Sequence, residues 1–83
     1  MNIVEVTWED AACESTHLDM EDAKSIRPML RKNVGYLICD TPEKLNLSSG
    51  IIEDLDKSAS CVSNTLTIPR VNVKCIRTLE DVL

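Results

Sequence analysis

The side chains best suited to metal or acid-base chemistry gather between residues 13 and 19. Cys13, His17 and Asp19 place a thiol, an imidazole and a carboxyl group within seven residues of one another. These three groups are common ligands of zinc and other transition metals. A closed site needs a fourth ligand, which the local spacing does not supply. We therefore expect a solvated loop here, with no bound metal and no cofactor.

Nucleophilic catalysis is the second chemistry that these residue types suggest. Cys13 lies four residues before His17, the only histidine, and the two side chains would meet on a helix. No third group that would orient the imidazole is evident, and an activated thiol needs such a partner. Neighbouring acids such as Glu21 and Asp22 point in different directions and predict a charged surface. We expect that the protein is not an enzyme.

Charge is distributed unevenly along the first 32 residues. Six acids lie between residues 9 and 22, and four bases lie between residues 24 and 32. The net charge of -5 makes nucleic acid an unfavourable partner, because phosphate contacts need clustered bases. The acidic segment predicts contact with a basic protein surface, with Asp10, Asp19, Glu21 and Asp22 as candidates. The alternative is an oligomer that captures an anionic, nucleotide-like ligand through Arg27, Arg31, Lys32 or Arg70.

Size and composition indicate a single domain over residues 1–83. Phenylalanine is absent, so the core must be built from Leu, Ile and Val around Trp8 and Tyr36. The alternative for these two aromatics is a stacking platform for a base or a peptide. The first residues carry no signal-peptide pattern, and no apolar run approaches the roughly 20 residues of a membrane span. We expect a cytoplasmic protein with no membrane contact.

Four cysteines are scattered along the chain, at positions 13, 39, 61 and 75, with no Cys-x-x-Cys pair. Two disulfides in three possible pairings would be conceivable. The wide spacing favours reduced thiols in a reducing compartment instead. Cys39 and Cys75 lie in apolar strand candidates, where we expect each thiol to act as a small core hydrophobe.

Alternating hydrophobicity predicts the first three strands. Residues 3–8 place Val4, Val6 and Trp8 on one face. Residues 34–39 have the β-branched and aromatic content of a central strand, in which Gly35 allows a bulge or a close backbone approach. A turn at 40–43 joins this strand to residues 44–48, and the Ser-Ser-Gly sequence at 48–50 is expected to end the hairpin.

The last two strands meet at a corner marked by Pro69. Residues 51–57 are predicted to form a loop with a helical turn, although 51–52 would also suit a strand extension. Strand character resumes at 61–62 or at Thr65. Proline cannot donate to a ladder, so Pro69 ends the strand in which Leu66 and Ile68 share a face. A 3₁₀ turn then leads into a short strand, whose apolar side chains are Val73, Ile76 and Leu79.

Residues 9–33 form the one long connection, and long connections often carry function. A helix over residues 20–26 is predicted there, capped by Asp19 or Ser15 and ended by Pro28. The alternative is an irregular loop whose apolar side chains cover an open end of the barrel. Those side chains are Leu18, Met20, Ile26, Met29 and Leu30.

Together these elements predict a mainly β domain, a five-stranded, partly open barrel of the SH3-like or Sm-like kind. Such a barrel has two free strand edges. Another copy of the chain can cover these edges, so we expect a homo-oligomer.

Several of these patterns also resemble a group of short uncharacterised phage and prophage proteins. The shared features are a Trp-x-Asp start at Trp8 and Asp10, a Val-Gly-Tyr-Leu strand at residues 34–37, and an Ile-Pro close at residues 68–69. The resemblance implies a small phage-linked β protein in the cytoplasm of a bacterial host. From it we expect a noncatalytic interaction module that acts on a host component, such as one used in defence. A virion or assembly component is a further alternative.

Overall fold

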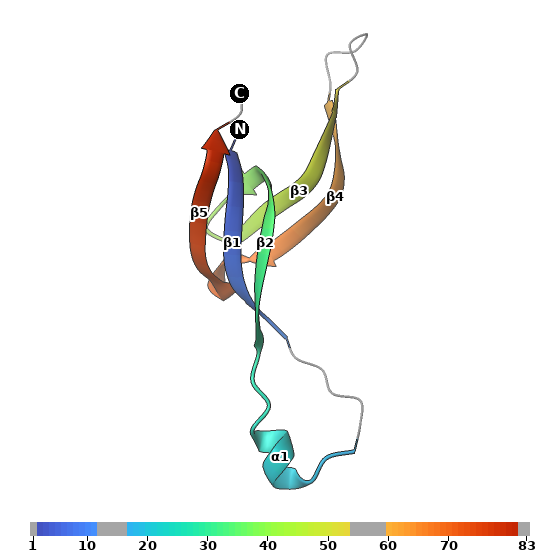
Figure 1. Cartoon of the computed structure of the whole chain (residues 1–83), viewed down its shortest axis with the longest axis vertical. Helices are drawn as coiled ribbons and strands as arrows, with labels where there is room; N and C mark the ends of the chain where they lie inside the picture. Colours follow the sequence, from blue (N-terminus) through green and yellow to red (C-terminus); the bar gives the residue numbers. More distant parts are fainter. Residues whose placement is uncertain (1, 12–16, 54–59, 82–83) are drawn as a thin grey trace.

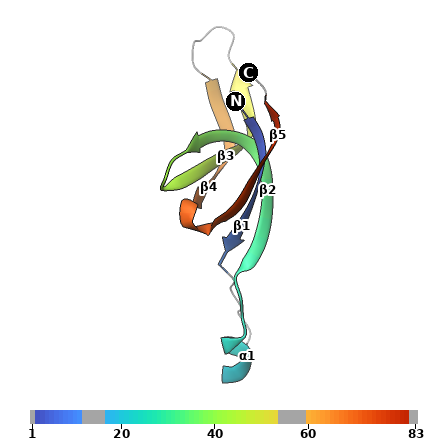
Figure 2. The same ribbon diagram turned by 90° about the vertical axis from the view of Figure 1, so that its left-hand side faces the viewer.

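The computed structural model describes residues 2–11, 17–53 and 60–81, and these form the predicted mainly β fold with five antiparallel strands. The elements, in chain order, are β1 (Asn2–Asp10), α1 (Met20–Lys24), β2 (Met29–Asp40), β3 (Lys44–Glu53), β4 (Ser60–Pro69), η1 (Arg70–Asn72) and β5 (Val73–Asp81). The strand order is β4-β3-β2-β1-β5, so β4 and β5 are the edges of a single sheet. The sheet curls around one interior, as a partly open barrel requires (Figures 1 and 2).

The interior is small and aliphatic around one indole ring. Its buried side chains are Val4, Val6, Trp8, Leu45, Leu47 and Ile68, and partly buried Leu37, Leu66, Val73 and Ile76 pack against them. The alternation predicted for β1 is confirmed, and Trp8 is a core residue. Tyr36 is only half-buried.

Leu79 lies outside the core, unlike Val73 and Ile76 of the same strand, because it is 46% exposed. The register explains the difference. Val4 pairs with Thr78 and Ile3 pairs with Glu80, so Leu79 falls in the irregularity between them. A bulge residue has no opposite partner and is turned away from the regular alternation.

The close backbone approach predicted at Gly35 is confirmed. A Cβ atom at this position would lie 2.8 Å from the Ser48 carbonyl oxygen, which is closer than real Cβ contacts permit. Only glycine lets β2 pass this close to β3. The contact lies where β2 stops pairing with β1 and begins to pair with β3, and it therefore allows the sheet to curl.

The break predicted at residues 48–50 is wrong, because β3 continues to Glu53. Gly50 pairs with Ser63, and Ile51 pairs with Val62. Pairing with β4 overrides the weak local strand propensity of the Ser-Ser-Gly sequence. The loop predicted for 51–57 is therefore wrong over residues 51–53, while residues 54–57 lie outside the described part. β4 begins at Ser60, slightly before the expected start at 61.

The short helix is confirmed with Asp19 as its N-cap. The Asp19 carboxylate accepts a hydrogen bond from the backbone N–H of Asp22 at 2.8 Å, while Ser15, the other candidate cap, lies outside the described residues. The helix ends at Lys24, two residues earlier than expected, and Ser25 is its C-cap. Pro28 is therefore not the residue that ends it.

The corner after β4 is confirmed. Pro69 ends β4, and a single 3₁₀ turn over Arg70–Asn72 leads into β5. The Arg70 N–H donates to the Glu43 carbonyl at 2.9 Å, which ties this corner to the loop between β2 and β3. In that loop the Thr41 hydroxyl accepts from the Lys44 N–H at 3.2 Å.

Candidate functional site

The long first connection is a projecting β1–β2 arm, which we define as residues 9–11 and 17–33. Much of it is strand, because Asp10 pairs with Met29 and Glu9 pairs with Leu30. α1 lies at the far end of the arm, away from the barrel (Figures 1 and 2). The arm carries five exposed large apolar side chains, namely Leu18, Met20, Ile26, Met29 and Leu30. The alternative in which these residues cover the barrel end is therefore wrong.

The acids proposed for binding are all on this arm, but they are in different environments. Asp10, at its base, accepts from Arg31 at 2.6 Å. Asp19 caps α1, and Glu21 lies 3.7 Å from Lys24 within the helix. Asp22 is exposed. The structure thus brings Asp19, Glu21 and Asp22 together at the tip, while Asp10 fastens the two strands at the base.

The bases proposed for an anionic ligand do not gather in the same way. Arg31 and Lys32 are consecutive residues of a strand and therefore point to opposite faces. Arg70 lies in η1 and contacts Asp40 at 2.9 Å. Arg27 is exposed in the segment between α1 and β2. Arg31 and Arg70 are each already paired with a carboxylate. Capture of an anion by these four bases stays a prediction.

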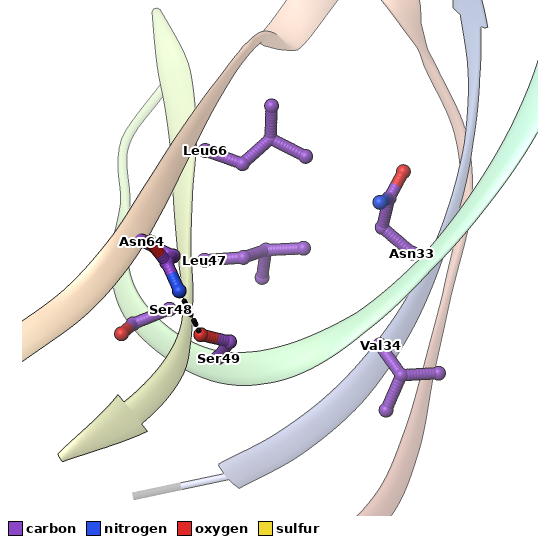
Figure 3. A pocket seen from close by; sticks show the side chains of 7 residues that line it. All are labelled: Asn33, Val34, Leu47, Ser48, Ser49, Asn64 and Leu66. Atoms are coloured by element: carbon purple, nitrogen blue, oxygen red, sulfur yellow. Dashed lines mark hydrogen bonds between the residues drawn. The ribbon is translucent and has the colours of Figure 1, made fainter.

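A pocket of about 100 Å³ lies between the base of the arm and the β3–β4 hairpin; we call it the fork pocket. Its residues come from the three consecutive strands β2, β3 and β4 (Figure 3). The lining residues are Asn33, Val34, Leu47, Ser48, Ser49, Asn64 and Leu66.

Both asparagines in the fork pocket are held by hydrogen bonds. The Trp8 indole Nε1–H donates to the Asn33 Oδ1 at 2.8 Å. The Asn64 Nδ2 donates to the Ser49 hydroxyl at 3.2 Å. Asn64 is the only non-glycine among the described residues with a positive φ, 50°, a left-handed conformation that asparagine tolerates better than most residues.

Sequence reasoning missed the fork pocket, because its walls meet only through tertiary structure. One local signal was available: the Ser-Asn sequence at 63–64 interrupts an otherwise strand-like run, and asparagine is among the residues that adopt a positive φ.

The Cys13, His17 and Asp19 group is only partly described, because Cys13 lies outside the described residues. His17 and Asp19 are exposed. Within the ranges 2–11, 17–53 and 60–81, no three histidine, cysteine or acidic residues are placed to share a metal ion.

The cysteine environments correct one expectation. Cys39, Cys61 and Cys75 have free thiols, but Cys75 is exposed rather than buried. Cys75 lies opposite Thr7 on the outward face of β5, because its neighbour Ile76 pairs with Val6 of the core. Cys39 is partly buried, as a residue of a central strand would be.

Comparison of the chain with models of known protein families, with curated proteins and with solved structures finds no match. Among the described residues, no helix has the length and apolar character needed to cross a membrane.

Proposed function

We propose that this protein is a noncatalytic interaction module that contacts a protein partner through its β1–β2 arm. The observation that carries this proposal is the exposure of apolar side chains on the arm. Met20 is 70% exposed and Leu30 is 67% exposed. In a domain this small every large apolar residue matters for the core, so apolar residues placed outside it mark an interaction surface.

The total accessible area supports the same proposal. The chain exposes 6414 Å², whereas a compact monomer of 9.3 kDa would expose about 5,000 Å². The radius of gyration, 16.8 Å, is likewise larger than the value of about 12 Å for a compact domain of this length.

The chemistry of the arm suggests what the partner surface looks like. The tip presents carboxylates at Asp19, Glu21 and Asp22 beside the exposed Leu18 and Met20. A complementary partner would offer an apolar groove bordered by basic residues. The resemblance to phage proteins leads us to propose a protein of the bacterial host as this partner, met in the host cytoplasm.

The ion pairs at the base of the arm support its use as a fixed projection. Arg31 holds Asp10 across the two arm strands, and Lys74 of β5 lies 3.3 Å from Glu9. Exposed pairs of this kind contribute little stability, about 0–1 kcal/mol each. Their effect here is to restrict the direction in which the arm leaves the barrel, which lowers the ordering cost when a partner binds.

Affinity capture from bacterial host extract tests the proposal. The tagged protein is compared with the arm variant Glu21→Lys/Asp22→Lys and with the variant Met20→Ser/Leu30→Ser. A matched control, Glu43→Lys/Glu80→Lys, reverses two exposed charges outside the arm. We expect one partner to be retained by the native chain and the control and to be lost from both arm variants. Equal recovery by all four proteins would contradict the proposal.

The same samples distinguish a foreign partner from a second copy of the chain. Sedimentation equilibrium of the purified protein gives its mass without any host component. A mass of 9.3 kDa would leave the arm available for a foreign partner. A larger mass that falls to 9.3 kDa in Met20→Ser/Leu30→Ser would identify the partner as another copy.

A further inference from the structure

We propose that the fork pocket binds a small neutral group that carries a carbonyl oxygen and an N–H pointing in opposite directions, as a uracil-like ring or a carboxamide does. This inference goes beyond the proposed arm contact and does not depend on it. It also differs from the expected anionic ligand, because the described residues that line the pocket include no charged side chain. An uncharged, half-apolar lining favours a neutral ligand, since burying an unpaired charge there would cost free energy.

Asn33 supplies a hydrogen-bond donor on one wall. The Trp8 indole can only donate, so its bond to Asn33 identifies the accepting atom as Oδ1 and leaves the two N–H groups on Nδ2. Figure 3 shows the Asn33 side chain extending from β2 into the gap opposite Leu47 and Leu66. A carbonyl oxygen of a ligand in this gap would accept from Nδ2.

Asn64, an exposed residue on the other side of the pocket, supplies an acceptor. Its Nδ2 donates to the Ser49 hydroxyl, which itself lies 3.4 Å from the Ser63 carbonyl oxygen and can donate to it. This chain of bonds assigns the amide orientation and leaves Oδ1 as the acceptor. The left-handed backbone at Asn64 is a local departure from strand geometry that positions this amide, and such departures concentrate at ligand-binding positions.

The apolar side chains and the volume define the size of the ligand. Leu47 is buried and Leu66 is partly buried, and both contribute to the apolar part of the lining. A cavity of about 150 Å³ holds a benzene ring completely. The fork pocket, at about 100 Å³, is open to solvent on one side and suits one edge of a six-membered ring or a carboxamide.

Titration of the full-length protein with uracil, followed by ¹H–¹⁵N correlation spectra, tests this inference. Uracil carries such a pair, C4=O and N1–H across the ring, while 1,3-dimethyluracil has the same ring without an N–H and is the matched control ligand. A small fragment will bind weakly, with a Kd of about 1–10 mM. We expect saturable shifts of the Asn33 and Asn64 side-chain amides with uracil, and at least fivefold weaker binding of the dimethyl compound.

Two substitutions test where the ligand binds, and they keep the Trp8 hydrogen bond and the backbone conformation at position 64. Asn33→Asp keeps an oxygen for the Trp8 N–H but removes the donor, and Asn64→Gly keeps the positive φ but removes the acceptor. Asn72→Asp adds the same charge in η1, outside the pocket, and is the control. We expect each pocket variant to weaken uracil binding about tenfold, and the control to bind as the native chain does.

Acetamide has a carbonyl oxygen and an opposed N–H without a ring, and it distinguishes the two sources of this pair. Binding of acetamide as strong as that of uracil would assign the pocket to a carboxamide, such as a glutamine side chain. Binding of uracil alone would assign it to a uracil-like ring. The inference is overturned if neither compound gives saturable shifts, if dimethyluracil binds equally well, or if the shifts lie outside the pocket.

Discussion

Trp8 and Asn33 are joined by a hydrogen bond of 2.8 Å across neighbouring strands β1 and β2. Trp8 is the largest residue of the core, and Asn33 lines the fork pocket next to that core. The bond therefore has two roles, because it satisfies the indole N–H and orients the pocket amide. The interior of the barrel and its candidate ligand site share this pair of residues.

Loss of the Trp8 to Asn33 bond should destabilise the fold. Asn33→Ala leaves a partly buried indole donor without its partner, and we expect the free energy of unfolding to fall by about 1–2 kcal/mol. Asn33→Asp retains an acceptor for the indole N–H, so its free energy of unfolding should fall less. Urea unfolding followed by Trp8 fluorescence measures both. Equal losses in the two variants would mean that the bond is not the cause.

A methyl group should be costly at Gly35 but not at Gly50. In Gly35→Ala the new Cβ would lie 2.8 Å from the Ser48 carbonyl oxygen, so the backbone must move, at a cost of about 1–3 kcal/mol. In Gly50→Ala the nearest atom is the Ser63 Cβ at 3.9 Å, an ordinary contact. Thermal unfolding of the two variants provides the comparison. Similar midpoints would show that β2 and β3 are less closely packed than we describe.

Substitution of a core leucine and of an arm leucine should have very different effects on the free energy of unfolding. Leu45 is fully buried, and Leu45→Ala should cost about 2–5 kcal/mol. Leu30 is largely exposed, and Leu30→Ala should change stability by less than about 0.5 kcal/mol. Denaturant titration at several protein concentrations measures this difference. A large, concentration-dependent loss in Leu30→Ala would show that a second copy covers the arm.

Removal of the helix cap should loosen α1 and leave the barrel intact. Asp19→Ala deletes the acceptor of the Asp22 N–H and should cost the helix about 1 kcal/mol, while Asp19→Asn keeps a capping oxygen. Hydrogen exchange should accelerate at Ala23, whose N–H donates to the Asp19 carbonyl. Exchange of the β1 amides should not change. Faster exchange in β1 as well would mean that the arm and the barrel unfold together.

Thiol reactivity should follow the exposure of the three described cysteines. In a Cys13→Ser background, we expect Cys61 and Cys75 to react with a thiol reagent at the rate of a free peptide, because both are exposed. Cys39 is partly buried and should react more slowly. Reaction kinetics followed by mass spectrometry assign each site. Slow reaction at Cys75 in the native protein would indicate that another chain covers β5.

Short-range sequence patterns correctly predicted those structural features that are determined by neighbouring residues in the chain. The alternation of Val4, Val6 and Trp8 required a strand with one buried face, since successive side chains of a strand point to opposite sides. Pro69 required a strand end, because it lacks an N–H. Asp19 was one of two caps that the sequence offered for a short helix, because its carboxylate can accept from the first free N–H groups. These features depend only on neighbouring residues.

Tertiary structure decided everything that depends on which strands are neighbours. β3 continues through Ser48 and Gly50 because β4 lies beside it, and the register irregularity between β1 and β5 turns Leu79 outward. The close passage at Gly35 brings Asn33 near the β3–β4 hairpin and so creates the fork pocket. Pairing between distant strands sets these positions, and no short-range pattern records which strand will supply the partner.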